Sequence, residues 1–370
     1  MGIPFTGSPG PLNAITDVPG VEVGYVTLVE GSGPLRVGAG PVRTGVTAIL
    51  PRGRDGVGMP CAAGWHSLNG NGEMTGTTWI SETGALSLPV LITNTHAIGP
   101  CHRGVIDWVV ANRPEAATGW LLPVVAETYD GYLNDINGSH VTAAHAVQAI
   151  DDAAPGPVEE GSVGGGTGMN CYAFKAGSGT ASRLVHHGGD RYTVGAFVQA
   201  NFGRRHELVV AGQQVGDALG VENPMDEAHQ AVPPGAGSVI VVVATDAPLL
   251  PGQCEALARR VPLGLARTGT TGSHFSGDIF LALSTANPGA LGSTKSADGT
   301  EGYDELRFIQ WGSIDPLYET VVTSVEEAVL NALIANDTTV GRDDHRSPAL
   351  PHDPLTDLLT ERGVALAPLR

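Results

Sequence analysis

Short apolar runs recur along the chain, and glycine, proline or polar residues separate them. Val239–Ala244 is an unbroken run of mostly β-branched residues, which is typical of a strand that is buried on both faces. Comparable runs predict further strands. These are expected at Gly45–Leu50, Leu88–Thr93, Val194–Ala200, Glu207–Ala211 and Asp278–Leu283.

Apolar residues at helical spacing predict three helices, at His140–Ala153, Gln253–Ala266 and Asp315–Ala335. The third has the strongest start signal, because a proline directly follows its first acidic residue. Helices and strands coexist here without the strict alternation of a doubly wound sheet. The pattern therefore favours an α/β (α+β) fold with two packed sheets flanked by helices.

Composition narrows the possible partners and the compartment. Only 16% of the 370 residues are charged, and the net charge of −18 makes nucleic acid an unlikely partner. No apolar run is long enough to span a membrane and the first residues show no basic-then-apolar pattern, so we expect neither a membrane span nor a leader peptide. The four cysteines are far apart, which indicates free thiols in the cytoplasm. No linker divides the chain, so we expect one domain, 1–370.

Several cofactor and nucleophile motifs are absent. Gly164–Gly168 resembles a phosphate-binding loop, but the lysine of a Walker motif does not follow it. The chain has no GxSxG elbow, which argues against an α/β-hydrolase. The twelve histidines show no metal-ligand spacing. We expect neither a cofactor nor a metal.

The most informative pair of residues is Gly237-Ser238. It joins the loop 216–237, the longest stretch without helical or strand periodicity, to the buried strand that follows. The Ser238 hydroxyl is placed to attack the carbonyl of Gly237, which has no side chain to hinder the attack. Cleavage there would give fragments 1–237 and 238–370 and leave Ser238 with a free amine beside its own hydroxyl. The alternative is a plain turn into a strand.

Ser276 and Asp278 form the first pair of candidate partners for Ser238. They lie two residues apart at the start of a predicted strand, so their side chains share one face. A hydroxyl next to a carboxylate could orient the Ser238 hydroxyl and stabilise the nearby ammonium. The alternative is a polar strand end that faces water.

Three further residues complete the candidate site. Asn201 ends a predicted strand, where its amide could donate to an oxyanion. Glu127 follows an apolar stretch and could bind a substrate ammonium, while Tyr129 could wall the pocket or donate a second oxyanion hydrogen bond. Alternatively, these residues are an ordinary turn asparagine and a turn with a half-buried tyrosine.

Longer ordered segments make the chain resemble the L-aminopeptidase/D-esterase and β-aminopeptidase family, and the DmpA type within it most closely. The resemblance covers nearly the whole chain. It rests on segments Asn13–Gly24, Gly40–Gly53, Asn69–Gly76, Gly164–Met169, Gly179–Arg183, Val198–Gly203 and Val243–Pro248.

The resemblance implies a four-layer αββα sandwich, similar to N-terminal nucleophile hydrolases and ornithine acetyltransferases. It also implies self-cleavage between Gly237 and Ser238, and homo-oligomers of αβ units. In this family the substrates are small peptides, amides or esters with a free amine. The family's nucleophile falls on Ser238, its orienting pair on Ser276 and Asp278, and its oxyanion asparagine on Asn201. Its amine-binding glutamate and the pocket neighbour fall on Glu127 and Tyr129.

Other functions remain open on the sequence alone. Acyl transfer of the ornithine acetyltransferase type and nylon-oligomer hydrolysis both use a threonine where this chain has Ser238. An uncleaved binding protein is the alternative from a different class. It would run as one band on a denaturing gel.

Overall fold

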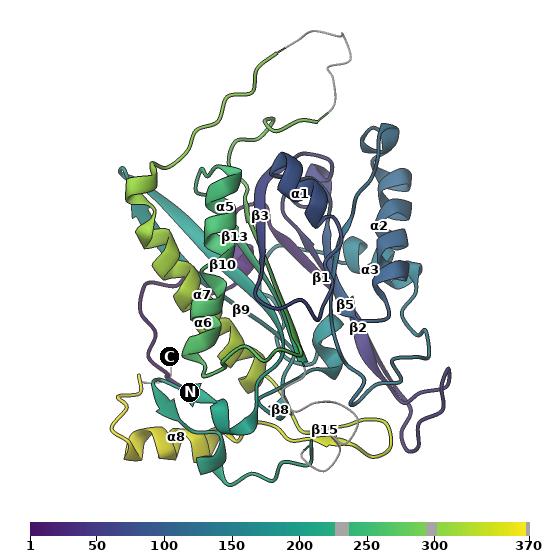
Figure 1. Ribbon diagram of the computed structural model, residues 1–370, viewed down its shortest axis with the longest axis vertical. Helices are drawn as coiled ribbons and strands as arrows, with labels where there is room; N and C mark the ends of the chain where they lie inside the picture. The colour runs from purple at the N-terminus through teal and green to yellow at the C-terminus, as the bar shows by residue number, and fades with distance from the viewer. Residues whose placement is uncertain (226–236, 294–301, 368–370) are drawn as a thin grey trace.

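The computed structural model describes residues 1–225, 237–293 and 302–367. Two β-sheets are stacked face to face at its centre (Figure 1). The smaller sheet has four strands. β2 is antiparallel to both β1 and β5, and β5 is parallel to β6. Its strands, in spatial order, are β1 (Glu22–Glu30), β2 (Val42–Leu50), β5 (Val90–Asn94) and β6 (Val124–Thr128).

The larger sheet has six strands, and β13 lies in its interior between β14 and β10. β13 is parallel to β14 and antiparallel to β10. In spatial order the strands are β4 (Ala85–Leu86), β3 (Cys61–Ser67), β14 (Ser276–Ser284), β13 (Gly237–Thr245), β10 (Asp190–Asn201) and β9 (Ser178–His187).

Helices cover the outer face of each sheet. Figure 1 shows α2 (Ile98–Asn112) and α3 (Ala143–Asp151) on one side of the molecule. On the other side lie α5 (Pro251–Ala258), α6 (Val261–Arg267) and α7 (Asp315–Ile334). The expected four-layer αββα sandwich is therefore confirmed.

Shorter elements complete the described structure. Its remaining helices are α1 (Thr77–Thr83) and α8 (His352–Glu361), and its short strands pair as β7 (Asn170–Cys171) with β8 (Phe174–Lys175), β11 (Val209–Val210) with β12 (Gln213–Gln214), and β15 (Thr339–Val340) with β16 (Arg346–Ser347). The 3₁₀ turns are Ile15–Asp17, Arg54–Gly56, Ala116–Thr118, Gly164–Gly168, Arg205–Glu207, Asp217–Leu219 and Trp311–Ser313.

Strand β13 shows why an unbroken apolar run is needed at the centre of the sandwich. Its alternate residues Val239, Val241 and Val243 pack in the core under the helices. Ile240 and Val242 point the other way, into the core between the two sheets. Because successive side chains of a strand face opposite sides, a strand with a core on each side is apolar throughout.

Two predicted elements are wrong in detail. The helix expected at Gln253–Ala266 is interrupted between α5 and α6, and Pro262 is the cause. Proline lacks an N–H and disfavours a helical residue before it, so it begins a new helix instead of continuing the old one. The strand expected at Glu207–Ala211 is reduced to the two residues of β11, because Glu207 ends a 3₁₀ turn. Residues 226–236 of the predicted loop 216–237 lie outside the described residues, and the described part includes the 3₁₀ turn Asp217–Leu219.

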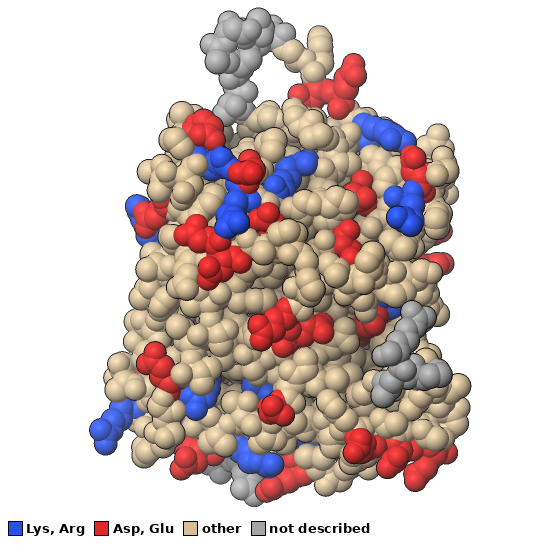
Figure 2. Space-filling view, turned by 180° about the vertical axis from the view of Figure 1, so that it is seen from behind, with Lys and Arg blue, Asp and Glu red and all other residues tan. Residues whose placement is uncertain are grey.

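The surface of the molecule carries charges of both signs. Figure 2 shows acidic and basic side chains interspersed on one face, with broad uncharged areas between them. Among the described helices, none combines the length and apolar character that a membrane crossing requires.

Candidate active site

Gly237 and Ser238 are the first two residues of β13. In the antiparallel pair with β10, Ser238 lies opposite Asn201, and in the parallel pair with β14 it lies opposite Gly277. Ser238 is buried. A side chain on Gly237 would lie 2.2 Å from the Asn201 carbonyl oxygen, so only glycine fits directly before the serine.

The Ser238 hydroxyl is held by the backbone of Tyr129. The Tyr129 N–H donates to Ser238 Oγ at 3.1 Å, and the Tyr129 carbonyl accepts from Asn201 Nδ2 at 2.9 Å. The Asn170 N–H donates to Asn201 Oδ1 at 3.0 Å, which fixes the orientation of the amide. An amide nitrogen carries two N–H donors, so one Asn201 donor is still available beside the hydroxyl. Two neutral donors next to a nucleophile are the elements of an oxyanion hole.

Tyr129 contributes to this geometry through its backbone. Its side chain is 38% exposed and folds over Gly131, where an added methyl group would lie 2.4 Å from the phenol oxygen. The sequence interpretation had assigned Tyr129 a wall or a second oxyanion hydrogen bond, without distinguishing ring from backbone. In the structure, the backbone N–H makes the bond to Ser238.

Ser276 and Asp278 lie side by side at the start of β14, as their spacing predicts. The Ser276 hydroxyl donates to Asp278 Oδ1 at 2.5 Å, and Asn69 Nδ2 donates to Oδ2 at 3.0 Å. Burial raises the pKa of Asp278, while these two bonds and the backbone N–H of Val239 oppose the rise. Val239 directly follows Ser238, so the carboxylate lies close to the position that a free Ser238 amine would occupy.

Glu127 lies near the end of β6, two residues before Tyr129, and is buried. The Glu73 N–H donates to one carboxylate oxygen at 3.1 Å, and the Thr95 hydroxyl donates to the other. Burial raises the pKa of Glu127, and these neutral donors oppose the rise. A buried carboxylate whose hydrogen-bond donors are neutral favours the approach of a cation, such as an ammonium group.

Gly72 connects the two halves of the site. A methyl group at Gly72 would lie 2.9 Å from Gly277 Cα and 3.1 Å from a Glu127 oxygen. Glu127 from the smaller sheet and the Ser276–Asp278 strand from the larger sheet therefore meet across this glycine. The structure thus brings all of the sequence-predicted site residues to one end of the sandwich.

Four residues of this arrangement were not assigned a role from the sequence: Asn69, Gly72, Thr95 and Asn170. Asn69 and Gly72 lie in a segment that carries the family resemblance, so their positions could have been singled out. Thr95 lies in a turn and Asn170 begins the short strand β7, and their contacts depend on how distant segments meet in three dimensions.

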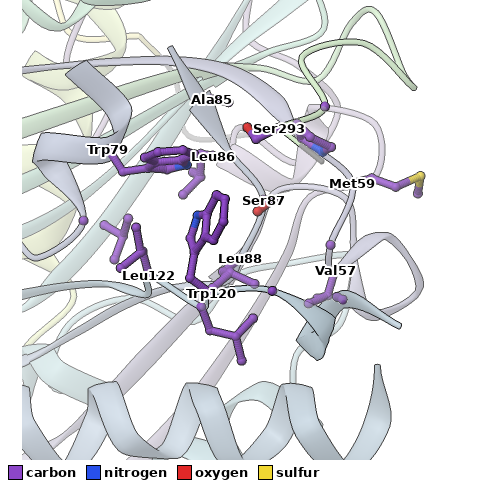
Figure 3. Close-up of a pocket in the computed structure, with 18 of the residues that line it drawn as sticks. Val57, Met59, Trp79, Ala85, Leu86, Ser87, Leu88, Trp120, Leu122 and Ser293 are labelled. Atoms are coloured by element: carbon purple, nitrogen blue, oxygen red, sulfur yellow. The ribbon is translucent and has the colours of Figure 1, made fainter. Parts of the chain in front are cut away.

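A large cavity lies at the other end of β6. It has a volume of about 660 Å³, and Val124, the first residue of β6, lines it. Figure 3 shows Trp79 and Trp120 next to one another in its lining, in an edge-to-face contact with ring centroids 5.6 Å apart. This cavity is therefore distinct from the cluster of polar groups around Ser238.

A serine hydroxyl beside hydrogen-bond donors, on the interior strand of an αββα sandwich, defines the class of serine hydrolases with an Ntn-type fold. Comparison with known proteins agrees with that class. The model of peptidase family S58 matches residues 13–347. The chain belongs to peptidase family S58 and is a serine peptidase of the aminopeptidase type.

Individual relatives are similar over nearly their whole length. The β-peptidyl aminopeptidase BapA of Sphingosinicella microcystinivorans is 49% identical, and the match covers 99% of this chain and 93% of that protein. The L-aminopeptidase D-Ala-esterase/amidase of Ochrobactrum anthropi, a prototype of the serine aminopeptidases with a variant Ntn hydrolase fold, is 45% identical. Its structure matches with a TM-score of 0.90 over 99% of this chain and 98% of that one. A β-aminopeptidase of Burkholderia sp. matches with a TM-score of 0.87, 45% identity and the same coverage.

Proposed function

We propose that this chain cleaves itself between Gly237 and Ser238 and then acts as an N-terminal serine aminopeptidase. The two products are an α subunit, 1–237, and a β subunit, 238–370. The observation that carries the proposal is the hydrogen bond from the Tyr129 N–H to Ser238 Oγ, next to the Asn201 amide. The nucleophilic atom thus lies among donors that can stabilise a developing oxyanion.

In the cleavage step, Ser238 Oγ attacks the Gly237 carbonyl carbon. The C–N bond between the two residues breaks, the Ser238 nitrogen becomes an amine, and Gly237 is held as an ester on the hydroxyl. Water then hydrolyses that ester to give the Gly237 carboxylate and the free Ser238 hydroxyl. The missing side chain of Gly237 supports this step, because nothing but hydrogen shields its carbonyl.

In turnover, the Ser238 amine accepts the hydroxyl proton while Oγ attacks the first carbonyl of the substrate. Asn201 and the Tyr129 N–H stabilise the oxyanion, the leaving amine or alcohol departs, and water hydrolyses the acyl-enzyme. Ser276 and Asp278 orient the amine and the hydroxyl. Glu127 pairs with the free ammonium of the substrate, which restricts the reaction to the N-terminal residue.

The proposed pH dependence follows from the amine. Its unperturbed pKa is about 7.7–8.0, and only its neutral form accepts a proton. Activity therefore rises with pH through that range, until the substrate amine loses the proton that Glu127 needs. A profile with its maximum below pH 6 contradicts this assignment.

The proposed substrates are small peptides, amides and esters with a free N-terminal amine. The names of the relatives support both β-peptides and L-amino acid amides or D-alanine esters. We also propose homo-oligomers of αβ units, in line with the family resemblance. A cytoplasmic location is supported by the four cysteines, which are all free and buried.

The test uses Ser238→Ala beside the natural chain, with a denaturing gel, intact mass and a panel of aminoacyl nitroanilides. The natural chain is expected as two fragments and active. The variant is expected as one 38.0 kDa band without activity. N-acetylated substrates serve as controls, because they lack the ammonium that Glu127 would bind. A fully active continuous polypeptide would overturn the proposal.

A further inference from the structure

The segment 69–73, between β3 and α1, contacts both halves of the site. Asn69 bonds Asp278, and Asn71 Nδ2 donates to the Phe275 carbonyl at 2.7 Å. The backbone N–H of Glu73 bonds Glu127. One short segment therefore contacts both the strand end that carries Ser276 and Asp278 and the carboxylate proposed to bind the substrate amine.

Asn69 is itself held in a single orientation. Its Nδ2 donates both to Asp278 Oδ2 and to the Ser273 carbonyl, each at 3.0 Å. The backbone carbonyl of Asn69 accepts a hydrogen bond from the Ser67 hydroxyl at 2.8 Å. The N–H of the preceding residue, Leu68, donates to the backbone carbonyl of Asp278 at 2.9 Å. The backbone that carries the Asn69 side chain is thus hydrogen-bonded to β14, the strand that carries Asp278.

Asp278 depends on such neutral donors. One of its carboxylate oxygens accepts from Ser276 and the other from Asn69, so the two bonds fix the plane of the carboxylate. Hydrogen bonds to the ionised form also favour that form against the cost of burial. Without Asn69, only the Ser276 hydroxyl and the Val239 N–H would oppose rotation and protonation of the carboxylate.

We propose that Asn69 is a positioning residue of the active site, which fixes the Asp278 carboxylate and thereby the orientation of Ser276 and of the Ser238 amine. This inference rests on the proposed function of Ser238. Asn69 acts only through Asp278 and does not contact the reacting atoms.

The first test compares Asn69→Leu with Asn71→Leu. Both variants remove a side-chain amide that ties the same segment to residues 273–278, but only Asn69 contacts Asp278. We expect Asn69→Leu to lower kcat about ten- to a hundredfold with little change in KM, since small misplacements of catalytic groups have costs of this size. Asn71→Leu reports the cost of loosening the segment alone. Rates are divided by the fraction of cleaved chain, measured by intact mass.

The second test uses Asn69→Asp, which keeps the size of the side chain and places a second carboxylate beside Asp278. The added negative charge favours the protonated form of the Ser238 amine. The acidic limb of the kcat/KM profile is therefore expected to move upward by about one pH unit. Asn71→Asp, farther from the carboxylate, is the charge control.

The outcomes separate the two proposals. Equal losses of kcat in Asn69→Leu and Asn71→Leu, or an unmoved acidic limb in Asn69→Asp, overturn the role of Asn69 while Ser238 stays the nucleophile. Should Asn69→Leu fail to fold, Asn69→Asp alone decides the question. Full activity of Ser238→Ala would instead remove the proposed function itself.

Discussion

Near the carboxyl end of β6, hydrogen bonds join Glu127 and Tyr129 to segments from both sheets. At its amino end, Val124 lines a cavity of about 660 Å³. Most residues that line it are apolar in type, among them Trp79 and Trp120, but polar atoms make up about half of its surface. The first region has buried polar side chains that are joined by hydrogen bonds. The second has volume and a pair of half-covered aromatic rings.

The difference shows what a hydrolytic site requires of this fold. Donors must already point at the atom that gains charge, because reorganising them during the reaction would cost free energy. Such preorganisation needs tight packing, as at Gly237 and Gly72, where even a methyl group would clash. A large cavity offers contact area instead of aligned donors. We therefore expect the amino end of β6, here called the apolar end after Val124, Trp79 and Trp120, to be dispensable for the chemistry.

Glu127→Gln is the most severe test of the carboxyl end of β6 among the substitutions that keep Ser238. The amide keeps the size of the side chain but cannot pair with the substrate ammonium. Removing one partner of a buried charge pair costs about 3 to 4 kcal/mol, so kcat/KM should fall roughly 10²- to 10³-fold. Steady-state kinetics on L- and β-aminoacyl nitroanilides measure this loss.

A substrate ester without an amine is the control for Glu127→Gln. Because it lacks the ammonium, the natural chain should hydrolyse it slowly, and the variant should hydrolyse it at the same slow rate. The pH dependence gives a second check. Burial raises the pKa of Glu127, so this group takes up a proton at a higher pH than an exposed glutamate would. As the pH falls, the natural enzyme should therefore lose amine binding early, which is seen as a rising KM. Equal losses on both substrates would argue that Glu127 has only a structural role.

Sequence reasoning succeeded where the information is local. The β-branched run predicted β13, and the two-residue spacing of Ser276 and Asp278 predicted their contact, since alternate residues of a strand share a face. The approach of Asn201 to Ser238 depends on the register between β10 and β13, and spacing along the chain does not specify that register. Asn69 is farther still in sequence, and no local pattern links it to Asp278.

The errors have equally local causes. Helical periodicity continues across Arg259–Val261, and the prediction followed it past Pro262, although proline starts a new helix there. For Tyr129 the sequence left ring and backbone undistinguished, and the contact with Ser238 comes from the backbone, which every residue shares. Backbone contacts of this kind leave no mark in residue type.

A buried amine, that of Lys175, lies beside the region of Ser238 and Glu127, and its charge offers a second test of that region. Its Nζ donates to the carbonyls of Met169 and Ala176, next to the Asn170 that bonds Asn201. Burial lowers its pKa to about 7, against about 10.4 in an unfolded chain. Between pH 7 and 9 the unfolded chain therefore binds a proton that the folded chain has released, so stability rises with pH in this window.

We expect this contribution to be about 2 to 3 kcal/mol between pH 7 and 9. Urea unfolding of the uncleaved Ser238→Ala chain measures it, with Lys175→Met added as the matched variant. The methionine variant should lack this part of the slope, whatever its absolute stability. Parallel pH curves for the two chains would show that Lys175 does not titrate in this range.

The smallest effect is expected at the apolar end, from Trp120→Ala. Trp120 is 60% exposed, and its edge-to-face contact with Trp79 accounts for much of its packing. Such an aromatic pair is worth about 1 kcal/mol, so the variant of the uncleaved chain should lose about that much stability in urea.

In the cleaved enzyme, kcat/KM on the nitroanilide panel should stay within about twofold of the natural value, since the cavity lies at the opposite end of β6 from Glu127. Trp79→Ala, which removes the other ring, should behave in the same way. A tenfold loss of kcat/KM in either variant would mean that the apolar cavity takes part in substrate binding, and the division of β6 into a chemical end and a dispensable end would no longer hold.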